Sequence, residues 1–281
     1  MYIEKSVYPF GKKKCLTFSY DDNRNKANVR LVELFKKYNM KATFNINGGR
    51  LADENQRNSE EAYNLLFKND LAKTFEGFEV ACHGFNHPHY CYMDNVQMTN
   101  DIIKDRFMLE GLLKKPIRGL ALPSGSYKED QKQVLKACGI VYSRTTKFTN
   151  GFDVPTDFLE WNPTVKHDNF EKLFELGKQY LGSSWKLTAF LSCMNVMGHA
   201  WELDSIKGGW EKLEEFLSMM ANNDDIWYAS NIELYDYITA LDNLIMTADG
   251  NCVINPSLVD VYVKADGEVV KIAAGETKMF N

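Results

Sequence analysis

CLTFSYDD, residues 15–22, is a β-branched and aromatic run that ends in two adjacent carboxylates. Such a run predicts a buried β-strand. Because successive side chains of a strand point to opposite faces, Asp21 and Asp22 would face different ways at its end. Two aspartates after a strand are also typical of a turn or a helix N-cap, and a helix is expected to begin at Ala27. The pair therefore indicates a site only in the company of other residues.

On either side of this stretch, short apolar runs alternate with longer amphipathic segments. The expected strands are Cys15–Tyr20, Ala42–Asn47, Phe78–His83, Ile117–Leu122, Ile140–Arg144, Leu187–Asn195 and Ile226–Ser230. The expected helices are Ala27–Tyr38, Val96–Leu113, Glu129–Ala137, Asn169–Tyr180, Trp210–Met220 and Ile232–Leu244. This order predicts parallel βα units and an α/β fold, a distorted seven-stranded (β/α) barrel. In such a barrel the functional residues gather where the strands end.

Two histidines, His83 and His87, stand four residues apart at the end of the third expected strand. In a helical turn this spacing places both imidazoles on one face, where they can bind a single cation. Three of the five histidines of the chain, His89 included, fall within seven residues. Two histidines and a carboxylate such as Asp22 leave coordination positions open for water and substrate, as a catalytic metal site requires.

The ordered motifs of the chain resemble those of the polysaccharide deacetylases, carbohydrate esterase family 4. They are Ser-Tyr-Asp-Asp at 19–22, His-x-x-x-His at 83–87, Pro-Ser-Gly at 123–125, Asp-x-x-Glu-Trp at 157–161 and Gly-His at 198–199. The resemblance covers residues 15–244. It implies an enzyme that removes acetyl groups from N- or O-acetylated carbohydrate with the help of a divalent metal. Zinc is the expected ion for two histidines and one carboxylate.

The same resemblance implies the roles of individual residues. Asp21 would be the general base, and Asp22, His83 and His87 would hold the metal. His199 would be the general acid, although a histidine in the core or at a helix end is the alternative interpretation. A metal lowers the pKa of bound water, so a neighbouring carboxylate can take the proton as the water attacks the acetyl carbonyl.

The chain departs from the family where an arginine is expected two residues before Pro123, because Ala121 stands there. Arg144 ends the neighbouring strand, and we expect it to supply the missing guanidinium; an arginine paired with a surface acid is the alternative. Its replacement by alanine is expected to cut turnover with little change in stability. Asp157 is expected to support the site from outside the metal ligands.

Three aromatic residues are expected to contact the substrate: Tyr127, Trp161 and Trp201. A backbone amide near Tyr127 could stabilise the oxyanion, and the indoles could line a floor for the acetyl methyl or stack on a sugar ring. Ordinary packing is the alternative for an aromatic residue near a barrel rim.

Composition excludes some classes of partner. The net charge of the 281 residues is −5, and no dense basic stripe is present to bind nucleic acid. No run of about 20 apolar residues could span a membrane, and the N-terminus lacks an apolar export segment, so a cytoplasmic protein is expected. The sequence does not indicate an oligomeric state.

The pattern changes near the C-terminus, where alternating valines flank Asp266-Gly267. We expect a barrel domain over residues 1–250 and a small β-hairpin appendage over 251–281. Two alternative functions remain open: hydrolysis of another small-molecule amide on the same scaffold, and binding of metal or sugar by a site that has lost turnover.

Overall fold

A sheet of parallel strands forms the centre of the molecule. The computed structural model describes residues 2–59 and 64–280, and in that part of the chain the sheet has eight strands. They are β2 (Lys14–Asp21), β3 (Thr43–Ile46), β4 (Glu79–Cys82), β5 (Gly119–Ala121), β6 (Tyr142–Arg144), β7 (Val165–Lys166), β8 (Ser192–His199) and β9 (Ile226–Tyr228). Seven follow the order β6-β5-β4-β3-β2-β8-β7, and β9 pairs with the first half of β2.

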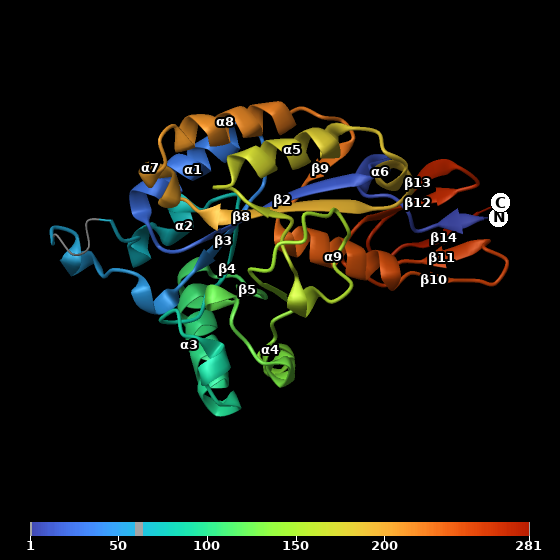
Figure 1. Cartoon of the computed structure of the whole chain (residues 1–281). Helices are drawn as coiled ribbons and strands as arrows, with labels where there is room; N and C mark the ends of the chain where they lie inside the picture. The colour runs from blue at the N-terminus through green and yellow to red at the C-terminus, as the bar shows by residue number, and fades with distance from the viewer. Residues whose placement is uncertain (1, 60–63, 281) are drawn as a thin grey trace.

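The sheet curls into the expected distorted (β/α) barrel (Figure 1). A parallel bridge between Arg144 and Trp161 links the outer edge of β6 to the segment that leads into β7. All eight residues of β2 are buried, because β3 and β9 share one of its edges and β8 occupies the other. The register places Asp21 beside both Asn45 and His199, so the last residue of β2 lies level with the end of β8.

The strand predicted at Leu187–Asn195 was wrong at its start. Residues Trp185–Ala189 form the short helix α6, and β8 runs from Ser192 to His199, so that His199 ends the strand instead of following it. Leu187 is the buried residue of α6, and its apolar neighbours merge with those of the strand in sequence. Periodicity cannot separate two such short apolar runs. Strand β7, only two residues long, was not predicted.

Helices cover the outside of the barrel. Besides α6, the described helices are α1 (Asn25–Lys37), α2 (Leu71–Thr74), α3 (Asn95–Leu113), α4 (Lys132–Ala137), α5 (Phe170–Leu181), α7 (Glu202–Ser205), α8 (Gly209–Met220) and α9 (Asn231–Asp242). Short 3-10 turns occur at Pro9–Gly11, Gly48–Arg50, Glu54–Gln56, Lys68–Asp70, Tyr90–Tyr92, Pro123–Gly125, Glu129–Gln131 and Phe158–Glu160. Helices α5 and α8 lie together outside β2 and β8, where the rings of Phe174 and Phe216 meet edge to face at 5.9 Å (Figure 1). None of the described helices has the length and apolar character needed to cross a bilayer.

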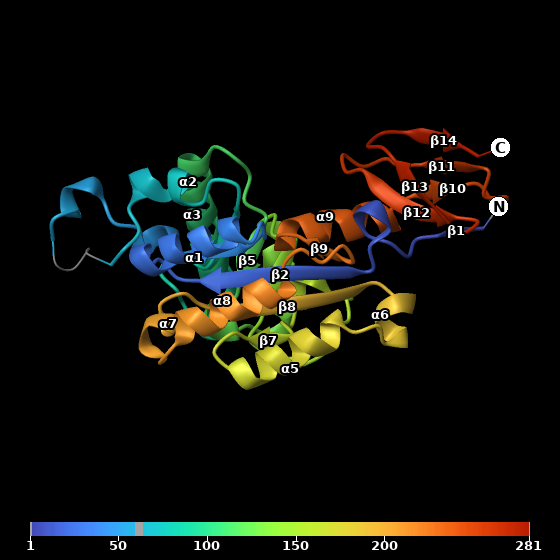
Figure 2. The ribbon, with the colours of Figure 1, turned by 90° about the horizontal axis from the view of Figure 1, so that it is seen from above.

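The C-terminal part is larger than the expected hairpin. The hairpin itself is present as β12 (Val261–Ala265) and β13 (Glu268–Ile272), joined at Asp266-Gly267. Strand β1 (Ile3–Glu4), from the other end of the chain, completes its sheet, and β10 (Ile245–Met246), β11 (Cys252–Ile254) and β14 (Thr277–Met279) form a second antiparallel sheet. Figure 2 shows both sheets beyond the start of β2, at the end of the barrel opposite the strand termini that carry the aspartates and histidines.

Candidate metal and acid–base site

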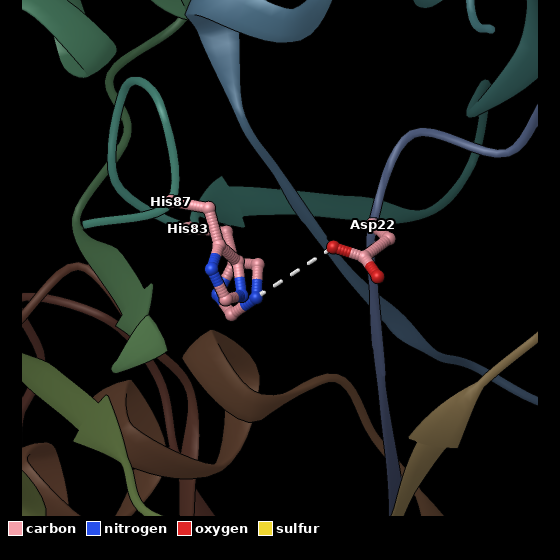
Figure 3. A group of neighbouring side chains, drawn as sticks. All are labelled: Asp22, His83 and His87. Atoms are coloured by element: carbon pink, nitrogen blue, oxygen red, sulfur yellow. Dashed lines mark ion pairs between the residues drawn. The ribbon is translucent and has the colours of Figure 1, made fainter. Parts of the chain in front are cut away.

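The predicted metal ligands meet at one rim of the barrel. The nearest ligand atoms of Asp22, His83 and His87 all lie within 4.8 Å of one another. Figure 3 shows the two imidazoles side by side, both facing the carboxylate of Asp22. Asp22 follows the last residue of β2 and has a φ of 78°, and its carboxylate, like that of Asp21, lies within 4.0 Å of Nε2 of His83. Both of the adjacent aspartates therefore reach the same site.

The surroundings of His83 suit a metal ligand. Its side chain is 1% exposed, and Nδ1 lies 2.9 Å from the backbone oxygen of Ala121, which leaves Nε2 to face Asp21 and Asp22. Nε2 has no hydrogen-bond partner among the described residues. A buried nitrogen without a partner is rare and calls for an explanation, which a cation bound between His83, His87 and Asp22 would provide. The set of donors, two imidazoles and one carboxylate, fits a divalent metal.

Burial also keeps both imidazoles in the form that binds metal. It lowers the pKa of His83, against the opposing effect of the Asp21 carboxylate. Burial likewise lowers the pKa of His87, although Asp22 acts in the other direction. Neutral imidazole is the form that binds a metal.

The turn that joins the two histidines is not helical, contrary to the sequence prediction. Gly84 and His87 have φ angles of 69° and 59°, and the amide of His87 donates to the oxygen of Gly84 at 3.3 Å. The rings meet at 80° with their centroids 4.8 Å apart. A positive φ at a residue with a bulky side chain is uncommon and is typical of functional sites.

Asp21 lies beside this cluster and is held in the ionised form. It is 4% exposed; Arg144, which is 0% exposed, donates to Oδ1 through Nη2, and Asn45 donates to the same oxygen at 2.8 Å. Burial alone would raise the pKa of Asp21, but Arg144, with smaller contributions from His83 and His199, lowers it to about 2. The other carboxylate oxygen, Oδ2, lies 3.8 Å from Nε2 of His83.

The position of Arg144 explains how it reaches Asp21 from another strand. Ala121 and Arg144 are partners in the register of β5 and β6, so the arginine lies level with the position at which the family has its own arginine. Its remaining groups are also paired: Nε donates to the hydroxyl of Ser19 at 3.2 Å and Nη1 to the oxygen of Thr145 at 3.0 Å. The guanidinium contacts a buried acid and not a surface one.

His199 lies on the other side of Asp21. Its Nε2 is 3.9 Å from Oδ2 of Asp21, and its Nδ1 is 3.2 Å from Oε2 of Glu202. Burial lowers the pKa of His199, but Glu202 and Asp21 outweigh burial and raise it. His199 is thus a half-buried residue, 22% exposed, that lies between the carboxylates of Asp21 and Glu202.

Of the three aromatic residues expected at the substrate, only Trp201 contacts the cluster. Its indole Nε1 donates to Oδ2 of Asp22 at 3.1 Å, and its ring is 39% exposed, with its centroid 5.4 Å from that of His199. Tyr127 is half-buried beside Glu160 and Lys132, and burial, together with Glu160, raises its pKa to about 12. Tyr127 has no described contact with the metal ligands.

Two residues that the sequence placed in the site, Trp161 and Asp157, contact other parts of the protein. Trp161 is 2% exposed and packs edge to face against Tyr142 and Phe158, so its ring cannot stack on a sugar. The bridge to β6 turns the indole into the core. Asp157 caps the 3-10 turn Phe158–Glu160 through the amide of Leu159 and forms an ion pair with Lys132 at 3.0 Å, with no described contact to His199.

Sequence reasoning missed two groups behind His199. Glu202 was not considered, although its position three residues after His199 is the spacing of neighbours on a helix. His167 was not placed in the site either; it is 0% exposed and hydrogen-bonded on both sides, to Glu202 and to Tyr20. Its neighbour Gly198 leaves the space for the ring, because a Cβ there would lie 2.2 Å from Cδ2 of His167.

Comparisons with known proteins agree with this geometry. Residues 10–143 match the family model for polysaccharide deacetylase. A Mycobacterium smegmatis protein assigned to the polysaccharide deacetylases superposes with a TM-score of 0.59 at 16% identity, covering 84% of this chain and 93% of that one. For a Pseudomonas aeruginosa PAO1 protein with the same assignment, the TM-score is 0.57 at 15% identity, with 81% and 91% covered.

A third neighbour is a pseudoenzyme of carbohydrate esterase family 4 from Bacillus anthracis. Its TM-score is 0.51 at 16% identity, with 81% of this chain and 66% of that chain covered. At these identities the structural neighbours establish the fold alone. No curated protein sequence gives a significant match. Residues 10–143 of this chain are thus similar to the polysaccharide deacetylase family, and the structural neighbours share its barrel fold.

Proposed function

We propose that this protein is a metal-dependent hydrolase that removes acetyl groups from N- or O-acetylated carbohydrate. One observation carries the proposal: the ionised Asp21 lies between the three metal-type ligands and His199, within 4 Å of an imidazole on each side. Base, metal ligands and acid are the three parts that hydrolysis of an acetyl group requires.

Asp22, His83 and His87 would hold the metal, with zinc as the expected ion. When bound, a divalent metal supplies a water of lowered pKa and stabilises the oxyanion. Asp21, kept ionised by Arg144, would accept the proton of the attacking water at Oδ2, because Oδ1 already accepts from Arg144 and Asn45. His199 would donate a proton from Nε2 to the leaving nitrogen or oxygen.

The exposed ring of Trp201 would provide an apolar wall for the acetyl group or the sugar. Its hydrogen bond to Asp22 would also orient that ligand, leaving the second carboxylate oxygen for the metal.

A site that binds without turnover is the second candidate, since a structural neighbour is a pseudoenzyme and a mutant of that protein has restored activity. The contact of Arg144 with Asp21 weighs against this candidate, because it supplies a guanidinium that the residue at 121 cannot. Hydrolysis of another small-molecule amide would use the same groups, and substrate tests separate it from deacetylation.

The first experiment measures metal content and acetate release from chitooligosaccharides, acetylated xylan and simple acetylated sugars. We expect about one divalent metal per chain. Alanine at His83 or His87 should lower metal affinity at least about tenfold and abolish acetate release. His89→Ala is the matched control, because His89 belongs to the same histidine-rich segment but is exposed and outside the cluster. A wild-type protein that binds no metal would rule out the proposal, and one that binds metal but releases no acetate would favour the alternatives.

A further inference from the structure

A line of buried and half-buried polar groups, Glu202, His167 and Lys166, extends behind His199. Glu202, on α7, is 14% exposed, and its Oε2 lies 3.2 Å from Nδ1 of His199 and 3.1 Å from Nε2 of His167. The same oxygen accepts the backbone N–H of His199 at 3.2 Å. Its other oxygen, Oε1, accepts from Lys166 at 2.6 Å. One carboxylate therefore serves two imidazoles.

The hydrogen bonds determine which ring nitrogens carry protons. A carboxylate only accepts, so Nε2 of His167 must bear a hydrogen toward Glu202. Burial lowers the pKa of His167, which keeps it neutral and leaves a lone pair on Nδ1. The hydroxyl of Tyr20 lies 3.1 Å from this Nδ1 and donates to it. His167 is thus a fixed neutral donor and does not neutralise Glu202.

Nδ1 of His199 lies 3.2 Å from the same carboxylate oxygen, within ion-pair distance, so Nε2 on the other side of the ring is left to exchange a proton with the reacting atoms. That nitrogen faces Oδ2 of Asp21 at 3.9 Å. Burial would raise the pKa of Glu202, but hydrogen bonds from His167, His199 and Lys166 lower it well below the usual range. The negative charge behind His199 is therefore permanent at physiological pH.

We propose that Glu202, backed by His167 and Lys166, is the positioning residue that orients His199 and holds its proton-bearing Nε2 toward the reacting atoms. This inference rests on the proposed function for its catalytic meaning. Glu202 takes the part that the sequence assigned to Asp157, whose carboxylate is 50% exposed and paired with Lys132. The groups of opposite charge that face His199 are Glu202 from α7 and Asp21 and Asp22 from the end of β2.

The direct test is NMR of ring-labelled histidines on the zinc-loaded full chain, which has only five histidines to assign. In the wild type we expect neutral His199 to carry its hydrogen on Nδ1 and to titrate above the usual range. Glu202→Gln should lower the pKa of His199 by about one unit or more, because an amide cannot replace the carboxylate charge. Glu202→Asp, which keeps the charge on a shorter side chain, should give a smaller change.

Asp157→Asn is the matched control, because it removes the acid of the family motif and should leave the pKa of His199 unchanged. The proposal would be overturned if the pKa of His199 were the same in Glu202→Gln as in the wild type. It would also be overturned if Asp157→Asn changed that pKa as much as Glu202→Gln does. Circular dichroism and thermal unfolding confirm that each variant is folded. If Glu202→Gln does not fold, the test uses Glu202→Asp alone. A pKa of His199 in Glu202→Asp equal to that of the wild type would then contradict the inference.

Kinetics provide the second readout. Glu202→Gln should reduce kcat about 10- to 100-fold with KM nearly constant, and the basic limb of its pH profile should move to lower pH. The two proposals can fail separately. Absence of acetate release by the wild type would refute the proposed function, whereas the NMR result would still decide the role of Glu202.

Discussion

At the scale of single residues, the pairing of Arg144 with Asp21 determines the charge at the centre of the site. Both side chains are almost completely buried, so neither charge is screened by water. Truncating one partner of a buried pair leaves the other charge without compensation. The structure thus changes the expectation that Arg144 could be removed with little effect on stability.

Arg144→Ala should reduce the free energy of unfolding by about 3–5 kcal/mol and raise the pKa of Asp21, in addition to cutting turnover. Arg144→Lys should retain much of the stability but not the activity, because a point charge cannot contact Asp21, Ser19 and Thr145 together. Denaturant unfolding and acetate release on the same preparations check this. An Arg144→Ala protein as stable as the wild type would show that the pair is not buried in solution.

The surroundings of His199 also depend on contacts of individual side chains. Glu202 and His167 are distant from each other in sequence and carry no common motif, yet one carboxylate oxygen lies within 3.2 Å of both imidazoles. Trp161 and Asp157, which stand in a motif of the family, instead contact Tyr142 and Lys132. A motif identifies residue types, and the contacts of the folded chain determine which of them reach the site.

At the scale of elements, the turn after β4 determines the metal geometry. Gly84 has a φ of 69°, and a Cβ there would lie 2.7 Å from Cδ of Pro88 and 2.9 Å from the hydroxyl of Tyr90. The turn is therefore restricted to glycine for two reasons, backbone conformation and close packing. It aligns His83 with His87 although no helix is present.

Gly84→Ala should destabilise the protein and weaken metal binding, because the added methyl displaces the turn that carries His87. Gly77→Ala is the matched control: Gly77 has a φ of 85°, but nothing lies within 4 Å of the added Cβ. The control should cost only the conformational penalty, about 1–2 kcal/mol, with metal affinity unchanged. Calorimetric titration with zinc and thermal unfolding measure both effects. Equal metal affinities in the two variants would contradict this role of the turn.

At the scale of the whole molecule, the site and the C-terminal sheets lie at opposite ends of the barrel (Figure 2). Helix α9 and the N-terminal segment connect the two parts: the backbone N–H of Tyr262, on β12, donates to the hydroxyl of Tyr237, on α9, at 3.1 Å, and this hydroxyl donates to the oxygen of Val7 at 2.8 Å. Val261, Val263 and Ile272 are completely buried between these elements. The sheets thus close the end of the core that is remote from the chemistry.

Val263→Ala should therefore lower the free energy of unfolding by about 1–3 kcal/mol and leave kcat and KM for acetate release unchanged. Val269→Ala, on the neighbouring strand but 44% exposed, is the control and should change stability little. A large loss of activity in a folded Val263→Ala protein would show that the two ends of the molecule are coupled.

The sequence by itself determined the parallel strands, the placement of Asp21, Asp22 and His83 at their ends, and the candidate guanidinium at Arg144. These features depend on local patterns, because a run of apolar residues marks a strand and the residue that follows it marks the rim. Adjacent short elements were harder to resolve, so α6 merged with β8 and the two-residue strand β7 was missed.

Only the tertiary structure decided which side chains meet across strands. The register of β5 with β6 places Arg144 level with Ala121, and the register of β2 with β8 places His199 beside Asp21. The burial of Trp161 and the sharing of Glu202 between two imidazoles follow from the curvature of the sheet and the placement of α7. The contacts of Asp21 with Arg144 and His199, and of Glu202 with His167, join residues far apart in the chain, so no periodicity or local spacing encodes them.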